Sequence, residues 1–180
     1  MANKKLSSAA YVERGYAQVE PNHLSAQRTG QIYAQLPLAS TLDKVENGQF
    51  VKYDYANNTV NLTGDGEWML VFNEIKLYDV RQQYEDFVFD NTLSAFHAVD
   101  GEGNIVNANP VPRVFKTNIG DIMTTNAINS DTVEVTNKLK VGADGFLTVD
   151  NSANEGMIWQ VAKVYTLADN QKAAKIIRIQ

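Results

Sequence analysis

The chain contains 180 residues, has a formal net charge of −5 at pH 7 and includes no cysteine. This length is enough to bury one hydrophobic core, or one β domain with an appendage. The lack of cysteine excludes disulfides, thiolate nucleophiles and cysteine-ligated zinc sites.

Charge is unevenly distributed along the chain. Residues 1–40 carry a balance of +2, whereas residues 41–180 carry a balance of −7. Within the acidic part, residues 54–103 contain ten acids and only two bases. Such a surface repels a phosphate backbone, so we expect no nucleic-acid partner.

The sequence shows no targeting or membrane segment. Lys4 and Lys5 lie near the N-terminus, but no apolar run follows them as it would in a secretory signal. No stretch approaches the roughly 20 apolar residues that cross a bilayer. We therefore expect a protein that is made in a cytoplasm and has no membrane partner.

An extended N-terminal arm is predicted over residues 1–40, which are rich in small and polar residues. Two short helices over 8–18 and 22–35 are the local alternative, but Gly15 and Gly30 weaken both. Tyrosine offers contact area and a hydroxyl at small entropic cost, so we expect the arm to bind a partner. The alternative is an N-terminus that is frayed or that packs within its own chain. The predicted partner-binding residues are Tyr11, Arg14, Tyr16, Leu24, Arg28, Ile32, Tyr33 and Leu36.

The next part of the chain predicts short strands joined by tight turns. Residues 49–55 alternate apolar and polar side chains, and residues 59–63 continue the alternation after a turn at 56–58. A second turn follows at 64–66. Residues 68–72 are apolar without a break, which indicates a strand that is covered on both faces.

Strand-like pieces continue at 87–89 and 94–99, and the latter leads into a hairpin turn at 100–104. Residues 109–112 contain two prolines, neither of which can donate to a ladder, so they indicate a linker or a sheet edge. Residues 132–136 alternate Thr and Glu with Val, which predicts a half-buried strand.

Two hairpins are expected in the C-terminal part. Residues 139–141 and 146–149 flank Gly-Ala-Asp-Gly at 142–145, where the glycines and the aspartate supply the positive-φ positions of a tight turn. Residues 158–167 and 172–179 are expected to form a long closing hairpin.

These patterns predict an all-β fold. About ten to twelve short strands with closely spaced turns favour a small β-sandwich or barrel body over any βαβ arrangement. The prolines near 110 divide this body into an acidic β unit over 41–109 and a C-terminal β unit over 110–180. A single merged domain over 41–180 is equally compatible with the pattern.

Catalytic and metal-binding patterns are weak. Residues 100–104 resemble the opening of a calcium loop but lack its later glycine and glutamate, so a solvated turn is favoured. Loop 150–155 is explained equally well without a cation. The close carboxylates at 85–86 and at Asp65 and Glu67 would need a cleft to act in glycoside hydrolysis. We therefore expect no enzymatic activity, no metal and no cofactor.

Charged residues interrupt the last apolar strand at Lys172, Lys175 and Arg178. The preferred interpretation is a charged sheet edge that prevents aggregation between sheets. The alternative is a small positive ridge for nucleic acid or an acidic protein surface. His97 lies between small and aromatic residues and is expected to be semi-buried.

Several phrases of the sequence carry a family resemblance over most of residues 42–180. They read ENGQFVKYD and VNLTGDGEWMLVFNEI in the first unit, and GDIMTTN, LKVGADGFLTV and IWQVAKVYTLADNQKAAKIIRI in the second. With the polar N-terminal arm and the acidic body, this layout resembles the head decoration proteins (cement, or auxiliary capsid proteins) of tailed bacteriophages.

The resemblance implies a non-enzymatic virion protein that settles on the outside of an assembled capsid and ties neighbouring capsomers together. Its partners would be the major capsid protein and other copies of itself on the lattice, and residues 1–40 would form the clamp. The alternative from the residues is a carbohydrate-binding or adhesin-like β module. That alternative needs exposed aromatic side chains on one sheet face, whereas Trp68 and Trp159 lie in apolar contexts typical of a core. A glycan-cleaving enzyme is the third hypothesis.

Overall fold

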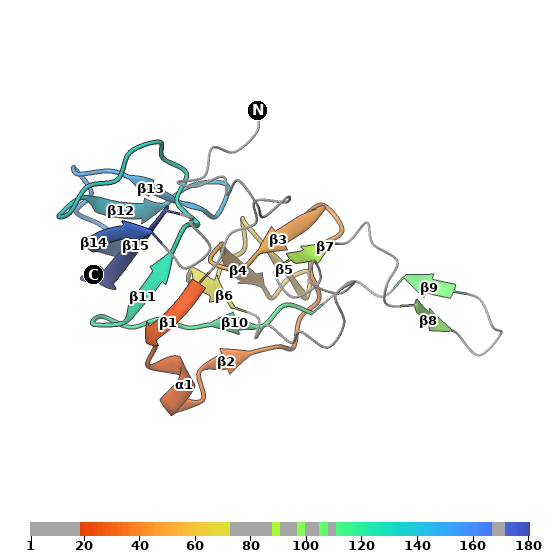
Figure 1. The fold of residues 1–180 in the computed structure, drawn as a ribbon. Helices are drawn as coiled ribbons and strands as arrows, with labels where there is room; N and C mark the ends of the chain where they lie inside the picture. Colours follow the sequence, from red (N-terminus) through yellow and green to blue (C-terminus); the bar gives the residue numbers. More distant parts are fainter. Residues whose placement is uncertain (1–18, 73–87, 91–96, 100–104, 108–110, 167–171) are drawn as a thin grey trace.

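The computed structural model describes residues 19–72, 88–90, 97–99, 105–107, 111–166 and 172–180 (Figure 1). Within them the chain forms two large antiparallel sheets, two small two-stranded sheets and one short helix. The all-β prediction is therefore confirmed, and the two open sheets correspond to a sandwich-like body and not to a closed barrel.

The larger sheet has six strands in the order β1-β11-β15-β14-β12-β13, and every neighbouring pair is antiparallel. The longest ladder joins β14 and β15, as the predicted closing hairpin requires. The turn between these two strands lies outside the described residues. The strands are β1 (Val19–His23), β11 (Ile122–Thr125), β12 (Lys138–Val141), β13 (Leu147–Val149), β14 (Ile158–Thr166) and β15 (Lys172–Arg178).

The second sheet has five strands in the order β2-β10-β6-β4-β5. Two small sheets add β3 to β7 and β8 to β9, and the β8–β9 pair lies away from the large sheets in Figure 1. The helix α1 (Ala26–Thr29) joins β1 to β2. The remaining strands are β2 (Ile32–Tyr33), β3 (Lys44–Glu46), β4 (Phe50–Asp54), β5 (Thr59–Asn61), β6 (Met69–Val71), β7 (Val88–Asp90), β8 (His97–Val99), β9 (Ile105–Asn107) and β10 (Val114–Phe115).

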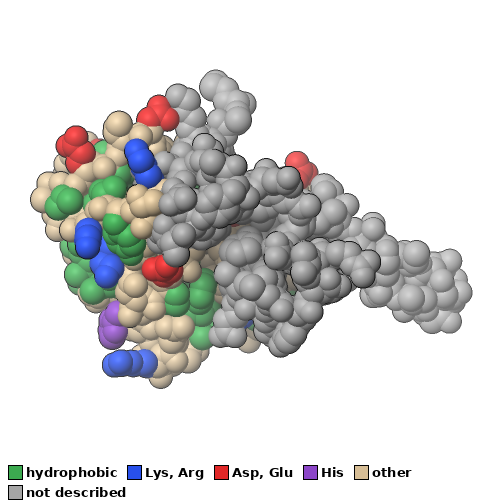
Figure 2. All heavy atoms as spheres, in the orientation of Figure 1, with side chains coloured by type: hydrophobic (Ala, Val, Ile, Leu, Met, Phe, Trp, Pro, Cys, Tyr) green, Lys and Arg blue, Asp and Glu red, His purple; other side chains and the backbone are tan. Residues whose placement is uncertain are grey.

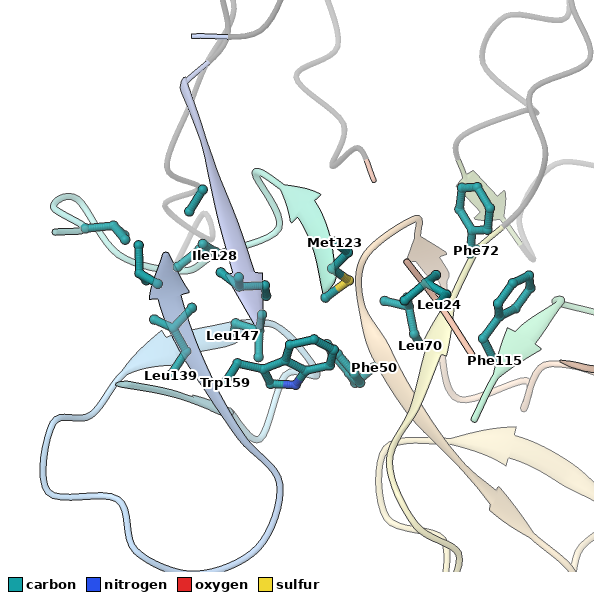
Figure 3. Packing of buried hydrophobic residues seen from close by; sticks show 14 of the residues in the cluster. Leu24, Phe50, Leu70, Phe72, Phe115, Met123, Ile128, Leu139, Leu147 and Trp159 are labelled. Atoms are coloured by element: carbon teal, nitrogen blue, oxygen red, sulfur yellow. The ribbon is translucent and has the colours of Figure 1, made fainter. Parts of the chain in front are cut away.

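The main hydrophobic cluster lies between the two large sheets. The rings of Phe50 on β4 and Trp159 on β14 meet with centroids 6.0 Å apart. Figure 3 shows these two side chains at the centre, with residues of both sheets around them. Burial of such apolar surface contributes about 25 cal/mol per Å², so this contact is a principal tie between the sheets. Other buried members are Leu24, Leu70, Phe72, Phe115, Met123, Ile128, Leu139, Leu147, Val161 and Ile176.

A second cluster covers the opposite face of the five-stranded sheet. Strand β6 alternates between the two clusters: Leu70 points to the first, while Met69 and Val71 point to the second. The unbroken apolar run at 68–72 therefore has the expected cause, because both faces of this strand are buried. Leu38 and Val45 cover the second cluster from outside the sheet.

Close backbone contacts fix the turn between β12 and β13 on the start of β4. The N–H of Phe50 donates to the carbonyl of Gly145 at 2.7 Å, and the side chain of Gln49 donates to the carbonyl of Asp144 at 2.7 Å. Gly145 has φ of 79°, and a Cβ there would lie 2.3 Å from the Phe50 carbonyl oxygen. Glycine is thus required both by the turn and by the neighbouring strand.

The structure corrects the predicted arm. Residues 19–39 belong to the body, because β1 pairs with β11 and β2 pairs with β10. Only the part of the predicted arm before Val19 stays a prediction, and it lies outside the described residues. The alternative helix over 22–35 is present only as the four residues of α1, which is capped at its C-terminus by Gly30 with φ of 70°.

The strand predicted at 132–136 is also wrong. The backbone turns at 134–137, where the side chain of Asn137 accepts the N–H of Glu134 at 2.8 Å and Thr136 has φ of 76°. Such local hydrogen bonds compete with a ladder, and a positive φ is incompatible with a strand. Val133 is buried while Val135 is 54% exposed, so the alternation does not correspond to two sheet faces.

The predicted charged edge is wrong for a topological reason. Strand β15, which carries Lys172, Lys175 and Arg178, lies between β11 and β14 inside the six-stranded sheet. The edges of that sheet are β1 and β13. Pro21 on β1 fits its edge position, because proline cannot donate to a second neighbouring strand.

The predicted boundary near residue 110 does not coincide with a boundary between the sheets. Strand β10 lies beyond it in sequence but pairs with β6 in the five-stranded sheet. The main hydrophobic cluster also takes residues from both sides of that position. Residues 109 and 110 themselves lie outside the described residues.

Candidate interaction surfaces

The predicted partner-binding residues do not form one exposed patch. Leu24 is buried and Ile32 packs against the main cluster, whereas Tyr33 and Leu36 pack against the second cluster. Arg28 is exposed on α1. Four of the five described side chains therefore hold the N-terminal part of the body in place. The three others lie outside the described residues: Tyr11, Arg14 and Tyr16.

A buried polar network fastens α1 to the six-stranded sheet. The backbone N–H and hydroxyl of Ser25 donate to the two carboxylate oxygens of Asp121 at 2.9 and 3.1 Å. The N–H of Asn118 adds a third bond to Asp121 at 2.9 Å. The Asn118 amide donates to the hydroxyl of Ser25 and to Gln31. Since Asp121 is only 2% exposed and its oxygens are occupied, this network is structural.

Arg178 extends this network along β15. Its guanidinium donates to the carbonyl and, at 3.0 Å, to the hydroxyl of Thr117. Burial lowers the pKa of Arg178 from its usual value, and the carboxylates of Glu67 and Asp121 partly oppose that shift. Arginine still keeps its charge in proteins, so a half-buried cation lies beside the Asp121 network.

Three tyrosines from β2, from β4 and from the residue after β4 are in ring contact with one another. The ring of Tyr53 makes edge contacts with Tyr33 at 5.8 Å and with Tyr55 at 5.7 Å. Tyr53 is buried and its pKa is raised by that burial, whereas Tyr55 is 66% exposed. We call Tyr33, Tyr53 and Tyr55 the tyrosine row. It offers one exposed aromatic ring held by two others.

Charged residues lie beside the tyrosine row. Lys116 forms an ion pair with Glu67, and this hydrogen bond raises the pKa of Lys116. Lys52 lies 4.8 Å from the centre of the Trp68 ring, a cation–π contact. Trp68 is half-buried and packs against the main cluster, while Trp159 is fully buried. The expectation that both tryptophans contribute to the core is therefore confirmed.

The outer face of the six-stranded sheet is rich in lysine. Figure 2 shows Lys and Arg side chains among hydrophobic ones over the part of the surface that this sheet forms. We define the lysine face as Lys138, Lys140, Lys163 and Lys175, whose strands are β12, β14 and β15. The ammonium of Lys138 donates to the carbonyl of Ala153 at 3.1 Å, and Lys140 pairs with Asp150 at 2.5 Å.

The described residues contain no group of three or more metal-ligating side chains. In loop 150–155 the carboxylate of Asp150 is engaged by Lys140 and by Ser152, and these contacts lower its pKa to about 2. Glu67 forms an ion pair with Lys116. The acids at 85–86 and loop 100–104 lie outside the described residues, as does the side chain of His97.

Among the described residues there is also no helix with the length and apolar character to cross a membrane. Comparisons with protein-family models, with curated proteins and with solved structures give no match.

Sequence reasoning missed both the tyrosine row and the lysine face. The row joins residues 20 positions apart through the pairing of β2, β10, β6 and β4, which local patterns do not give. The alternation of Val51, Tyr53 and Tyr55 was the available signal for it. The lysine face depends on strand register and on one β-bulge, for which the sequence contains no clear signal.

Proposed function

We propose that the protein is a structural virion component that binds the outside of an assembled phage capsid and ties neighbouring capsomers together. The supporting observation is the position of β1. It is an edge strand of the six-stranded sheet, and the chain before Val19 joins the body there. That preceding segment contains Tyr11, Arg14 and Tyr16, which suit a clamp on the major capsid protein.

The body supports this role because the chain from Val19 onward is tied into the two large sheets through β1 and β2. A segment that is ordered on docking can then bind without contributing to the core, and many weak copies on a lattice gain from avidity. The resemblance to head decoration proteins supplies the identity of the partner. The virion surface is accordingly the proposed location, with synthesis in the host cytoplasm.

A deletion of residues 1–18 tests the clamp. It spares β1 and β2, whereas a longer deletion through residue 36 would remove both strands and confuse binding with folding. We expect the shortened chain to keep its fold, measured by circular dichroism, and to lose co-sedimentation with capsids. Unchanged co-sedimentation would reject the clamp.

A matched pair of full-length variants refines the test. The first replaces Tyr11, Arg14 and Tyr16 with Ser, Gln and Ser, and the second, which also loses one positive charge, replaces Lys5 with Gln. We expect the first variant to bind capsids at least about tenfold more weakly, since lost aromatic and arginine anchors dominate interface energies. Equal losses in both variants would show that net charge alone is responsible.

The tyrosine row favours a second candidate function, carbohydrate binding. An exposed ring supported by other rings, with a charged pair beside it, is the kind of surface on which a sugar ring stacks. A glycan array with the wild type and Tyr55→Ala is the test. Binding that the substitution removes would support this function, and absence of binding from the whole array would reject it.

A further inference from the structure

The four lysines share the outer face of the six-stranded sheet because of strand alternation and one irregularity. Leu139, Trp159 and Ile176 point into the main cluster, so the neighbouring Lys138, Lys140 and Lys175 point the other way. On β14 the register shifts between Val161 and Lys163.

This register shift re-aims Lys163. Val161 is opposite Ile176, and Lys163 is opposite Lys175, so Ala162 is the extra residue of a β-bulge. Without it, Lys163 would share the inward direction of Val161. The bulge therefore brings a fourth lysine to the outer face, directly across from Lys175.

This arrangement is unfavourable for the isolated fold. Like charges directly opposite each other in an antiparallel pair destabilise a sheet. The ion pairs of Lys116 with Glu67 and of Lys140 with Asp150 do not include Lys163 or Lys175. Lys163 is exposed, and its ammonium lies 5.6 Å from the centre of the Tyr165 ring. An anionic partner would relieve this repulsion.

Acidic residues that complement the lysine face lie at the five-stranded sheet of the same chain. Asp54 ends β4, and its carboxylate accepts hydrogen bonds from Asn57 and Asn61 that lower its pKa. Asp65 is exposed in a turn whose glycines pack on the backbone of Tyr53, so it lies near Asp54. Tyr55 follows Asp54 and is the exposed member of the tyrosine row. We call Asp54, Tyr55 and Asp65 the acidic end.

Charge separation along the chain favours a second copy over a polyanion. Residues 41–110 contain 12 acids and 4 bases, whereas residues 111–180 contain 7 acids and 8 bases. A nucleic acid drawn to the lysine face would be repelled by the negative charge of the first of these regions, whereas a second copy presents the complementary charge of its acidic end.

We propose that the lysine face binds the acidic end of a second copy of this chain. Lys163 and Lys175 meet Asp54 and Asp65, and Tyr55 supplies an aromatic face for a lysine. Two different surfaces are joined, so the contact is head-to-tail and leaves one of each surface free for further copies. The role of this contact between copies on a capsid rests on the proposed function. The contact itself can form without a capsid.

Cross-linking of the full-length chain tests the contact directly. Equal amounts of ¹⁵N-labelled and unlabelled protein are treated with a carbodiimide, which joins lysine to carboxylate only where the two touch. We expect mixed-isotope products that join Lys163 or Lys175 to Asp54 or Asp65. Products within single copies only, or mixed products at other residues, would overturn the proposal.

Sedimentation equilibrium supplies the matched variants. We expect Lys163→Glu with Lys175→Glu to weaken self-association at least about tenfold, and a rise from about 50 to about 500 mM salt to weaken the wild type as well. Lys163→Glu and Lys175→Glu are also measured as single variants, and Lys172→Glu is the control for each of them. It has the same charge change on the same strand, but Lys172 lies on the opposite side by alternation. Equal weakening by the control would overturn the proposal.

A substitution in the acidic end tests the same contact independently, in case the lysine double variant misfolds. Asp65→Lys changes an exposed turn and is expected to weaken self-association by a similar factor. Mixing it with the Lys163→Glu copy is expected to restore association, and failure to restore it would count against the contact. DNA binding that depends on Lys163 would likewise overturn the choice of partner.

Capsid co-sedimentation of the same variants separates this contact from the proposed function. Loss of self-association with capsid binding retained would support the contact as distinct from the clamp. If capsid binding is lost only when residues 1–18 are deleted, that result supports the clamp and does not contradict the contact between lysine face and acidic end.

Discussion

Single glycines determine how closely the two large sheets approach. Gly48 precedes β4 of the five-stranded sheet and has φ of 86°. A Cβ there would lie 2.6 Å from the Cβ of Ala127, which follows β11 of the six-stranded sheet. Gly145 combines a φ of 79° with a backbone contact to Phe50. Both positions exclude any side chain, because a positive φ is costly for L-residues and the space is already filled.

Gly145→Ala is expected to destabilise the protein by about 2–4 kcal/mol. The strain of a positive φ contributes about 1–2 kcal/mol, and displacement of the neighbouring strand contributes a further loss of similar size. Urea unfolding measures this change. Gly120→Ala is the control, since Gly120 has φ of 93° but a Cβ there would meet no atom within 4 Å. Equal losses at both positions would show that the contact with Phe50 contributes nothing.

The pKa of Asp150 is a second residue-scale prediction. Its ion pair with Lys140 and its bond from Ser152 hold this pKa at about 2. A depressed carboxyl pKa gives stability that is present above the unfolded value near 3.8 and is lost as the pH falls toward 2. Lys140→Gln is expected to raise the Asp150 pKa toward 3.8, measured by NMR titration. Ser152→Ala should raise it less, because Lys140 is the larger cause.

At the scale of elements, α1 depends on the Asp121 network more than on its own helix. Four residues are too few for a stable isolated helix, and Ser25 forms no side-chain cap with it. Instead, Ser25 donates twice to Asp121, whose strand neighbours belong to the six-stranded sheet. The tertiary contact thus replaces the missing local stability.

Asp121→Ala is expected to cost about 2–4 kcal/mol, because it leaves the donors of Ser25 and Asn118 unpaired in a buried site. Ser25→Ala removes only one side-chain bond to this carboxylate and is expected to cost about 1 kcal/mol. Urea unfolding gives both values, and hydrogen exchange at residues 24–33 should rise more in the first variant. Similar exchange in the two variants would refute the central role of Asp121.

Local turn chemistry explains which elements the sequence predicts well. The hairpin β12–β13 was predictable because Gly142 and Gly145 bracket the turn, whose ends bond through the N–H of Gly145 and the carbonyl of Gly142 at 2.9 Å. The 132–136 strand failed because Asn137 captures the backbone of Glu134. A two-residue period does not reveal such a competing hydrogen bond.

At the scale of the molecule, the order of the strands within each sheet could not be predicted from local sequence patterns. The central position of β15 results from pairing with β11, about 50 residues earlier, and with β14. The same long-range pairing gathers the lysine face and the tyrosine row. Of the predicted partner-binding residues, Leu24 instead lies in the core and Ile32 packs against it, because apolar side chains on a polar segment look alike whether they bind a partner or their own body.

Phe50 bears on whether the β region unfolds as one unit or two. It lies in the five-stranded sheet, yet its ring meets Trp159 and its N–H bonds to Gly145, both beyond residue 110. If this shared core couples the sheets, Phe50→Ala should remove about 3–5 kcal/mol from the unfolding free energy of both. Native-state hydrogen exchange measures this at the amides of Val71 and Val161, which donate to carbonyls of Gln49 and Asn137.

Equal losses of protection at Val71 and Val161 are the expected result, since a cooperative domain exposes its deepest amides only in global unfolding. Tyr55→Ala is the control, because its ring is mostly exposed and its removal should leave both amides nearly unchanged. Loss of protection at Val71 with Val161 unaffected would instead show that the five-stranded and six-stranded sheets unfold as separate units. The contact between Phe50 and Trp159 would then be an interface between domains, worth less to either than a shared core.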